Sequence, residues 1–194
     1  MKFNKYCKLT LVLLLLISII LFSFSHHISS FKSAYTRGSL YQQIIFACSE
    51  NLFEQYTDLT VSKYKGIKSK DGNYVNCYNK KVTYNKHCYE ISYINSNDKN
   101  LYAFIKSNFG NANLTIYFYH DYYSINMLYE SDSYSFSTCF NVNLDFDTDN
   151  LSLEDEENYK KTLKIISEST IKETIEIFYR EANNDMKIIY DKLS

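Results

Sequence analysis

Residues 9–24 read LTLVLLLLISIILFSF, and this stretch decides how the rest of the chain is organised. It contains no charged residue and no Asn, Gln, Gly or Pro, and Lys2, Lys5 and Lys8 precede it. As a helix it extends about 24 Å, somewhat less than the ~30 Å hydrocarbon core of a bilayer. We therefore expect residues 9–25 to form a transmembrane anchor or a signal peptide, preceded by a cytoplasmic n-region at residues 1–8.

Both alternatives place the chain at a membrane. Ser23 and Ser25 supply small residues at the spacing of a signal-peptide cleavage site, so the leader is either retained or removed. The lysines before the apolar run predict a cytoplasmic N-terminus and a C-terminal domain outside. The chain is then a single-pass membrane protein, or a secreted protein if the leader is cleaved. A third alternative, a buried helix of a cytosolic fold, requires apolar partners on every face of the helix.

The composition bounds the class of partner. The chain has 21 basic and 22 acidic residues, and removing the three leading lysines leaves 18 basic residues in the exported part. This mildly acidic balance argues against nucleic acid as a partner. With 20 Tyr and 13 Phe, the core is expected to be aromatic, which favours β-sheet.

The hydrophobic periodicity changes along the chain. Residues 26–38 form a juxtamembrane stem that continues the apolar helix until Gly38, and residues 39–194 form one domain. Ser39 and Gln42 have the spacing of a helix capping box, and apolar residues then recur every three or four positions up to Tyr56. From Leu59 the period becomes two. The expected strands are 59–64, 74–78, 82–84, 88–94, 101–106, 114–120, 124–129 and 133–146, with a turn at 70–73.

A helical pattern returns near the C-terminus. Ser152 is a candidate N-cap, and an apolar stripe runs from Tyr159 to Phe178. The polar residues 182–185 predict a break before a short last helix. The sequence therefore predicts an α+β domain in which one helix, an antiparallel meander and a C-terminal helix pack together.

The cysteines of the exported part predict disulfides, because an oxidising compartment favours them. We expect Cys77 to pair with Cys88 across a hairpin, and Cys48 to pair with Cys139. In a reducing compartment they are instead small buried apolar side chains. A zinc site normally uses CxxC-type pairs, and the sequence has none.

The loop at residues 145–156 resembles an EF-hand calcium loop in part. Asp145, Asp147 and Asp149 occupy positions 1, 3 and 5, and Glu156 occupies position 12, which supplies a bidentate carboxylate in such loops. Asn150 stands where the loop requires Gly. The alternative is an acidic loop that leads into a capped helix.

Residues 117–123 are the densest aromatic stretch, YFYHDYY. They are either a core strand or an exposed surface for a protein or glycan partner. Glu50 and Glu54 have the spacing of one helical turn and are a candidate acid–base pair, or else two glutamates on the solvent face of a helix. Asn113 and Asn150 begin glycosylation sequons.

No catalytic constellation or cofactor motif stands out in the sequence. It favours a membrane-anchored or secreted protein with a binding or structural role. A secreted hydrolase and a calcium-stabilised extracellular module are the alternatives.

Overall fold

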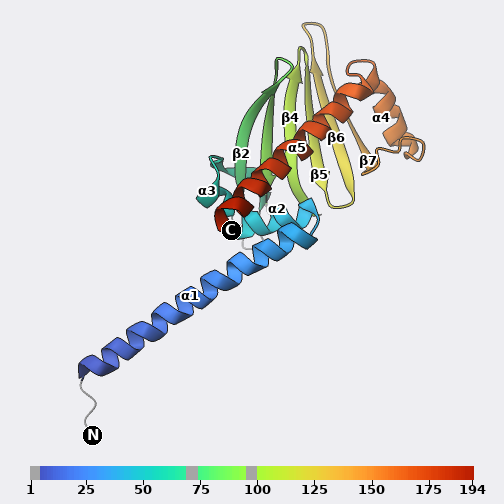
Figure 1. Cartoon of the computed structure of the whole chain (residues 1–194). Helices are drawn as coiled ribbons and strands as arrows, with labels where there is room; N and C mark the ends of the chain where they lie inside the picture. The colour runs from blue at the N-terminus through green and yellow to red at the C-terminus, as the bar shows by residue number, and fades with distance from the viewer. Residues whose placement is uncertain (1–4, 69–73, 95–99) are drawn as a thin grey trace.

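The computed structural model describes residues 5–68, 74–94 and 100–194. Its helices and strands follow the chain in this order: α1 (Lys5–Arg37), α2 (Leu40–Ser49), α3 (Leu52–Tyr56), β1 (Thr60–Lys68), β2 (Tyr74–Tyr84), β3 (His87–Ile94), β4 (Leu101–Phe109), β5 (Ala112–Tyr119), β6 (Tyr122–Glu130), β7 (Ser135–Asn143), α4 (Leu153–Leu163) and α5 (Glu168–Leu193). The predicted α+β class is confirmed (Figure 1).

Helix α1 is continuous from the apolar run into the domain, as the sequence predicts, and its first half projects away from the other elements (Figure 1). Apolar side chains in this half face outward: Val12 is 55% exposed and Phe22 76%. The helix is long and apolar enough to cross a membrane. The alternative of a helix buried inside a globule is wrong, because none of its most apolar window is buried.

The sheet has seven strands in the order β1-β2-β3-β4-β5-β6-β7, and every neighbouring pair is antiparallel. The predicted meander is therefore confirmed. One boundary was wrong, because 74–78 and 82–84 belong to a single strand, β2. Its pairing with β3 runs without interruption from Cys77 opposite Ile94 to Tyr84 opposite His87. The turn predicted at residues 70–73 lies outside the described residues.

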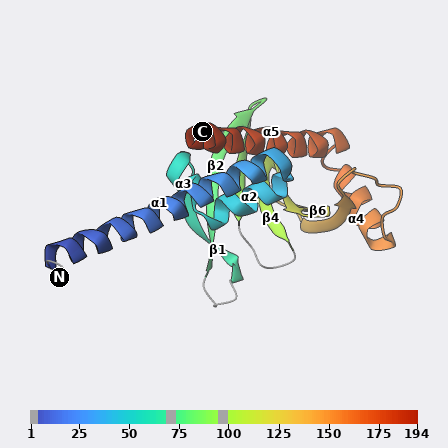
Figure 2. The ribbon, with the colours of Figure 1, turned by 60° about the horizontal axis from the view of Figure 1, so that its bottom comes forward.

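Helices cover one face of this sheet. Helix α5 crosses that face obliquely, and α2 lies at one end of it (Figures 1 and 2). Strand β5 shows the two environments, since Leu114, Ile116 and Phe118 are buried under the helices while Asn113 and Thr115 point to the opposite, open face. This alternation is typical of an antiparallel sheet with one solvated side.

Aromatic rings fill the space between the sheet and the helices. Phe178 of α5 stacks on Phe118, with ring centroids 3.7 Å apart, and Phe53 of α3 stacks on Tyr93 at 4.7 Å. All of these rings are fully buried. Burial of each such ring contributes about 1.5–3 kcal/mol, so these contacts hold the helices on the sheet.

The C-terminal helices differ from the prediction. Ser152 does cap α4, since its hydroxyl accepts a hydrogen bond from Asp155 N–H. The helical stripe breaks earlier than expected, at residues 164–167, where Ser167 caps the start of α5. Helix α5 then continues through residues 182–185 without a break. Asp185 is buried there against the sheet, and this tertiary contact outweighs its low helix propensity.

Candidate functional site

The corner between α1 and α2 holds the projecting helix firmly on the domain. Gly38 N–H donates to the Ala34 carbonyl at 2.8 Å, and Gln43 Nε2 donates to the carbonyls of Tyr35 and Gly38. The predicted capping box of Ser39 is present. These bonds satisfy the carbonyls at the end of α1 and fix the direction in which the chain turns.

The last turns of α1 also belong to the core. Phe31 is fully buried and its ring lies 5.9 Å from that of Phe46. Tyr35 stacks on Tyr190 of α5, with ring centroids 4.4 Å apart. The apolar helix and the domain are therefore one packed unit, so α1 is a stiff stem.

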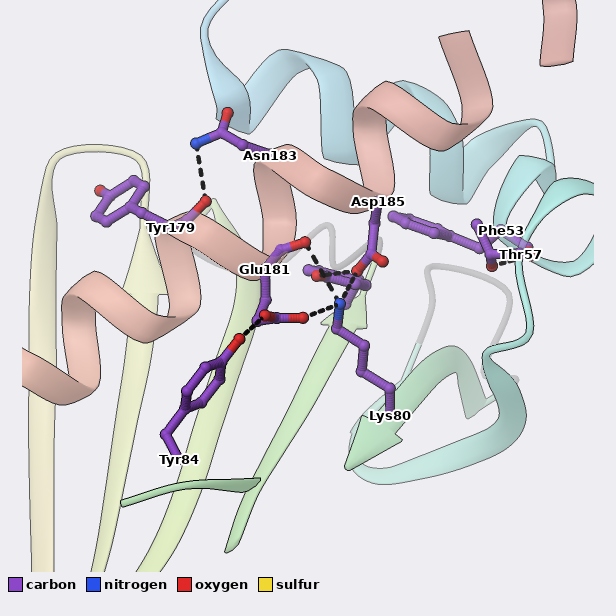
Figure 3. Close-up of polar contacts among 9 residues, drawn as sticks. Phe53, Thr57, Lys80, Tyr84, Tyr179, Glu181, Asn183 and Asp185 are labelled. Atoms are coloured by element: carbon purple, nitrogen blue, oxygen red, sulfur yellow. Dashed lines mark hydrogen bonds and ion pairs between the residues drawn. The ribbon is translucent and has the colours of Figure 1, made fainter. Parts of the chain in front are cut away.

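A charged cluster joins β2 to α5 on the helix-covered face of the sheet (Figure 3). Lys80 Nζ lies 2.8 Å from a Glu181 oxygen and 2.6 Å from an Asp185 oxygen. Tyr93 donates to Asp185 at 2.6 Å, and Tyr84 donates to Glu181. The two carboxylates stand four residues apart on α5, which places them on the same side of the helix.

The pKa values of the two acids move in opposite directions. Burial raises the pKa of Asp185 above its usual 3.8, although Lys80 acts against this. Burial also acts to raise the pKa of Glu181, but hydrogen bonds from Lys80 and Tyr84 outweigh it and hold this pKa below its usual 4.5. Each side chain of the cluster has a partner inside it, so the cluster fixes the position of α5 on the sheet.

The predicted Cys77–Cys88 bond is wrong for this fold. Both thiols are free. Cys77 lies opposite Ile94 and Cys88 lies opposite Thr83, so they are six residues apart along the hairpin. That separation is about 20 Å, whereas the Cα atoms of a disulfide are usually within ~7 Å.

The predicted Cys48–Cys139 bond is also wrong. Cys48 is buried in α2 on the helix-covered side, where its carbonyl accepts a hydrogen bond from Tyr78. Cys139 is exposed on β7, between Thr138 and Phe140, which are buried on the helix-covered face. The sheet therefore separates the two thiols. Alternate β7 side chains point to opposite faces, and the cysteine spacing in sequence gives no hint of this.

The acidic loop makes local contacts. Asp147 accepts hydrogen bonds from Asp149 N–H and from the Asn150 side chain, and these bonds lower its pKa, that of Asn150 most. Glu156 pairs with Lys160 inside α4. Over the described residues no group of three or more acidic, His or Cys side chains is placed to hold a metal ion, so Asp145, Asp147, Asp149 and Glu156 do not form a ready-made calcium cage.

The dense aromatic stretch at residues 117–123 is divided between two roles. Phe118 and Tyr123 are core residues, and Tyr123 exchanges a hydrogen bond with Tyr179 at 2.9 Å. Tyr119 and Tyr122 lie on the open face, half-buried and stacked on each other at 4.5 Å. The structure does not set Glu50 and Glu54 on one helix, because Glu50 ends α2 and Glu54 lies in α3.

A different aromatic cluster carries an exposed ring. Tyr129, Tyr134 and Phe136 gather where the β6–β7 hairpin ends, and their ring centroids are 5.5–6.0 Å apart. Tyr134 is 56% exposed. These residues are scattered at the edges of predicted strands, so neither density nor periodicity singled them out.

Beside these rings lies a shallow groove of about 420 Å³, which we call the tip groove. Its lining residues are Tyr134, Phe136, Ser137, Lys161, Lys164 and Ile165. The lysines come from the end of α4, and Lys161 pairs with Glu157 at 2.8 Å. The groove thus combines aromatic walls with two lysines, one of which is paired with Glu157.

The tip groove lies far from the stem. His120, in the β5–β6 turn, packs on Tyr41 of α2 with ring centroids 4.7 Å apart. Strand β6 runs from that turn to Glu130 at the opposite end of the sheet, about 30 Å away. Comparison of the chain with known protein families, curated proteins and solved structures finds no match.

Proposed function

We propose that this chain is a single-pass membrane protein whose domain stands outside the membrane on α1 and binds a protein partner through the tip groove. The observation that carries the proposal is the exposed ring of Tyr134, clustered with other aromatic rings at the end of the sheet opposite the stem. A surface in this position faces away from the membrane and is accessible to a partner.

The exposed ring of Tyr134 extends an aromatic cluster whose other two rings, Tyr129 and Phe136, are half-buried. A contiguous apolar patch rimmed by polar groups marks an interaction surface in soluble proteins, and Tyr and Phe are enriched in interface cores. Rings also contribute contact area with little loss of side-chain entropy. These properties support binding at Tyr134 and Phe136.

The charges at the groove indicate the kind of partner. Lys161 and Lys164 lie beside the rings, and the C-terminus of α4 adds partial negative charge that these lysines offset. A protein segment that carries an apolar side chain next to acidic residues would contact the aromatic rings with the one and the lysines with the others. Its carboxylates would also increase the association rate at low ionic strength.

The stem supports an anchored rather than a cleaved protein. Helix α1 runs without a break through Ser23 and Ser25 and ends only at Arg37, after packing Phe31 into the core. The lysines at the N-terminus favour the cytoplasm for that end. The domain is then presented on the outer side at a fixed angle.

A peptide-display library panned on the full chain in nanodiscs tests the binding role. We expect selected peptides to combine acidic with apolar residues and to lose at least about tenfold in affinity on Tyr134→Ala, as for an interface hot spot. Leu128→Ala, which removes an exposed apolar side chain of β6 that does not line the groove, is the matched control. Peptides that bind wild type and Tyr134→Ala equally would overturn the proposal.

A further inference from the structure

A small cavity lies where the stem meets the domain. Its volume is about 160 Å³, and Ile28 of α1, Phe46 of α2, Leu52 of α3 and Leu193 of α5 supply its apolar walls. Four separate helices therefore leave a gap where the membrane-directed helix meets the domain. We call this cavity the foot pocket.

Polar groups of the foot pocket bond to one another. Gln55 Nε2 donates to the Glu50 carbonyl at 3.3 Å, and Glu50 has a further interaction. Gln55 is exposed, which places polar groups at the rim while hydrocarbon side chains form the interior. Such a lining favours an apolar occupant, since an engineered apolar cavity of about 150 Å³ stays dry and binds benzene.

The position of the pocket identifies the source of that occupant. Ile28 stands four residues after the end of the apolar run at residues 9–24, which is about 6 Å along the helix axis. Helix α3 and the end of α5 lie on the side of the domain nearest the projecting half of α1 (Figures 1 and 2). The pocket therefore lies at the membrane side of the domain.

The length of the apolar run brings lipid to this position. A helix of about 24 Å is shorter than a ~30 Å hydrocarbon core, and the bilayer thins locally around so short a span. A full span of ~20 residues from Leu9 would end at Ile28. A pocket wall at Ile28 therefore lies within reach of lipid chains at the edge of the hydrocarbon layer.

We propose that the foot pocket binds a hydrocarbon chain of a bilayer lipid. This inference rests on the membrane anchoring put forward above, but not on the tip groove. The bound hydrocarbon chain replaces water or empty space against Ile28, Phe46 and Leu52. The angle between the stem and the domain is thereby coupled to the lipid around the stem.

The test uses the full chain in nanodiscs that contain a phospholipid with a photoreactive diazirine on one acyl chain. After illumination, mass spectrometry is expected to find adducts on Phe46, Leu52 or Tyr56 as well as along α1. Leu193→Trp fills the pocket from the end of α5, and it should abolish the adducts in α2 and α3 while adducts on α1 remain. Ile188→Trp, at an exposed position of α5, should leave both sets unchanged.

The outcomes separate the two proposals. Adducts on α1 alone in wild type would overturn the pocket and support the anchor, whereas no adducts anywhere would overturn both. A second arm uses a photoreactive free fatty acid in nanodiscs of unlabelled phospholipid. Adducts in α2 and α3 from the phospholipid arm identify a bilayer chain as the occupant, and adducts from the fatty-acid arm alone overturn that source.

Discussion

Lys80 of β2 places its ammonium 2.6 Å from the carboxylate of Asp185 on α5, and Asp185 is only 5% exposed. The same ammonium bridges to Glu181 one turn earlier on the helix. One cation therefore compensates two carboxylates and joins the last helix to an early strand. This contact holds the last helix on the sheet, over the aromatic core.

Lys80→Met should destabilise the domain by about 3 kcal/mol, because breaking a buried ion pair leaves an uncompensated charge. Here both carboxylates of the cluster lose their cation. The midpoint of thermal unfolding of the full chain in micelles measures the effect. Lys81→Met, at the exposed neighbouring position of β2, is the control and should stay within about 0.5 kcal/mol of wild type. Equal effects of both variants would contradict a structural role for the cluster.

The opposite pKa shifts in this cluster predict opposite pH dependences. The pKa of Glu181 is lowered below 4.5, so the folded state binds its proton less readily than the unfolded state, and its stabilisation is lost as pH falls. The pKa of Asp185 is raised above 3.8, so its deprotonation as pH rises reduces stability.

Glu181→Gln and Asp185→Asn should therefore diverge on acidification. Between about pH 7 and about pH 3, the stability of wild type relative to Glu181→Gln should fall, and its stability relative to Asp185→Asn should rise. Unfolding curves at several pH values provide both differences. Parallel pH profiles for the two variants would show that the acids do not occupy the environments described.

Gly38→Ala should loosen the stem. A Cβ at this position would lie 2.5 Å from the Ala34 carbonyl oxygen and 2.9 Å from Gln42 Oε1, so the corner between α1 and α2 must shift. We expect a loss of about 1–3 kcal/mol, as for other overpacked sites, and faster hydrogen exchange in residues 34–43. Ser33→Ala, at an exposed position five residues earlier, should change neither quantity. Unchanged exchange in Gly38→Ala would argue against a rigid corner.

Local sequence signals predicted most of the fold. The alternation of apolar residues identified the meander, and Ser39, Ser152 and Gly38 marked helix ends where the structure has them. The break placed at residues 182–185 was wrong for a non-local reason. Asp185 is stabilised within α5 by Lys80 and Tyr93, which lie far away in sequence.

The candidate sites depended even more on non-local geometry. The structure does not form the predicted cysteine pairs, because strand register and sheet face decide which thiols meet. The spacing of the cysteines along the chain gives neither the register nor the face. The tip groove was missed because Tyr134 and Lys164 come from β6–β7 and the end of α4, which only the fold brings together. The stretch at 117–123 was dense enough to notice, yet only two of its five Tyr and Phe rings, Phe118 and Tyr123, belong to the buried core.

The loop at residues 145–156 should stabilise the domain without calcium. Asp147→Ala removes the acceptor for Asp149 N–H and for the Asn150 side chain, and it should lower the unfolding midpoint of the domain slightly, because two local hydrogen bonds are lost. The unfolding midpoint of wild type should be the same with calcium and with excess chelator. A calcium-dependent rise in the midpoint that Asp147→Ala abolishes would establish the metal site instead.

The sidedness of the domain is the central claim, and its exposed thiols report it most directly. Cys88 and Cys139 are exposed, whereas Cys48 and Cys77 are buried. Intact cells that express the full chain, given a brief mild reductant and then a membrane-impermeant maleimide, should label the membrane-bound protein at Cys88 and Cys139. A variant with Ser at both positions should stay unlabelled. Labelling of wild type that appears only after the membrane is permeabilised would contradict the account.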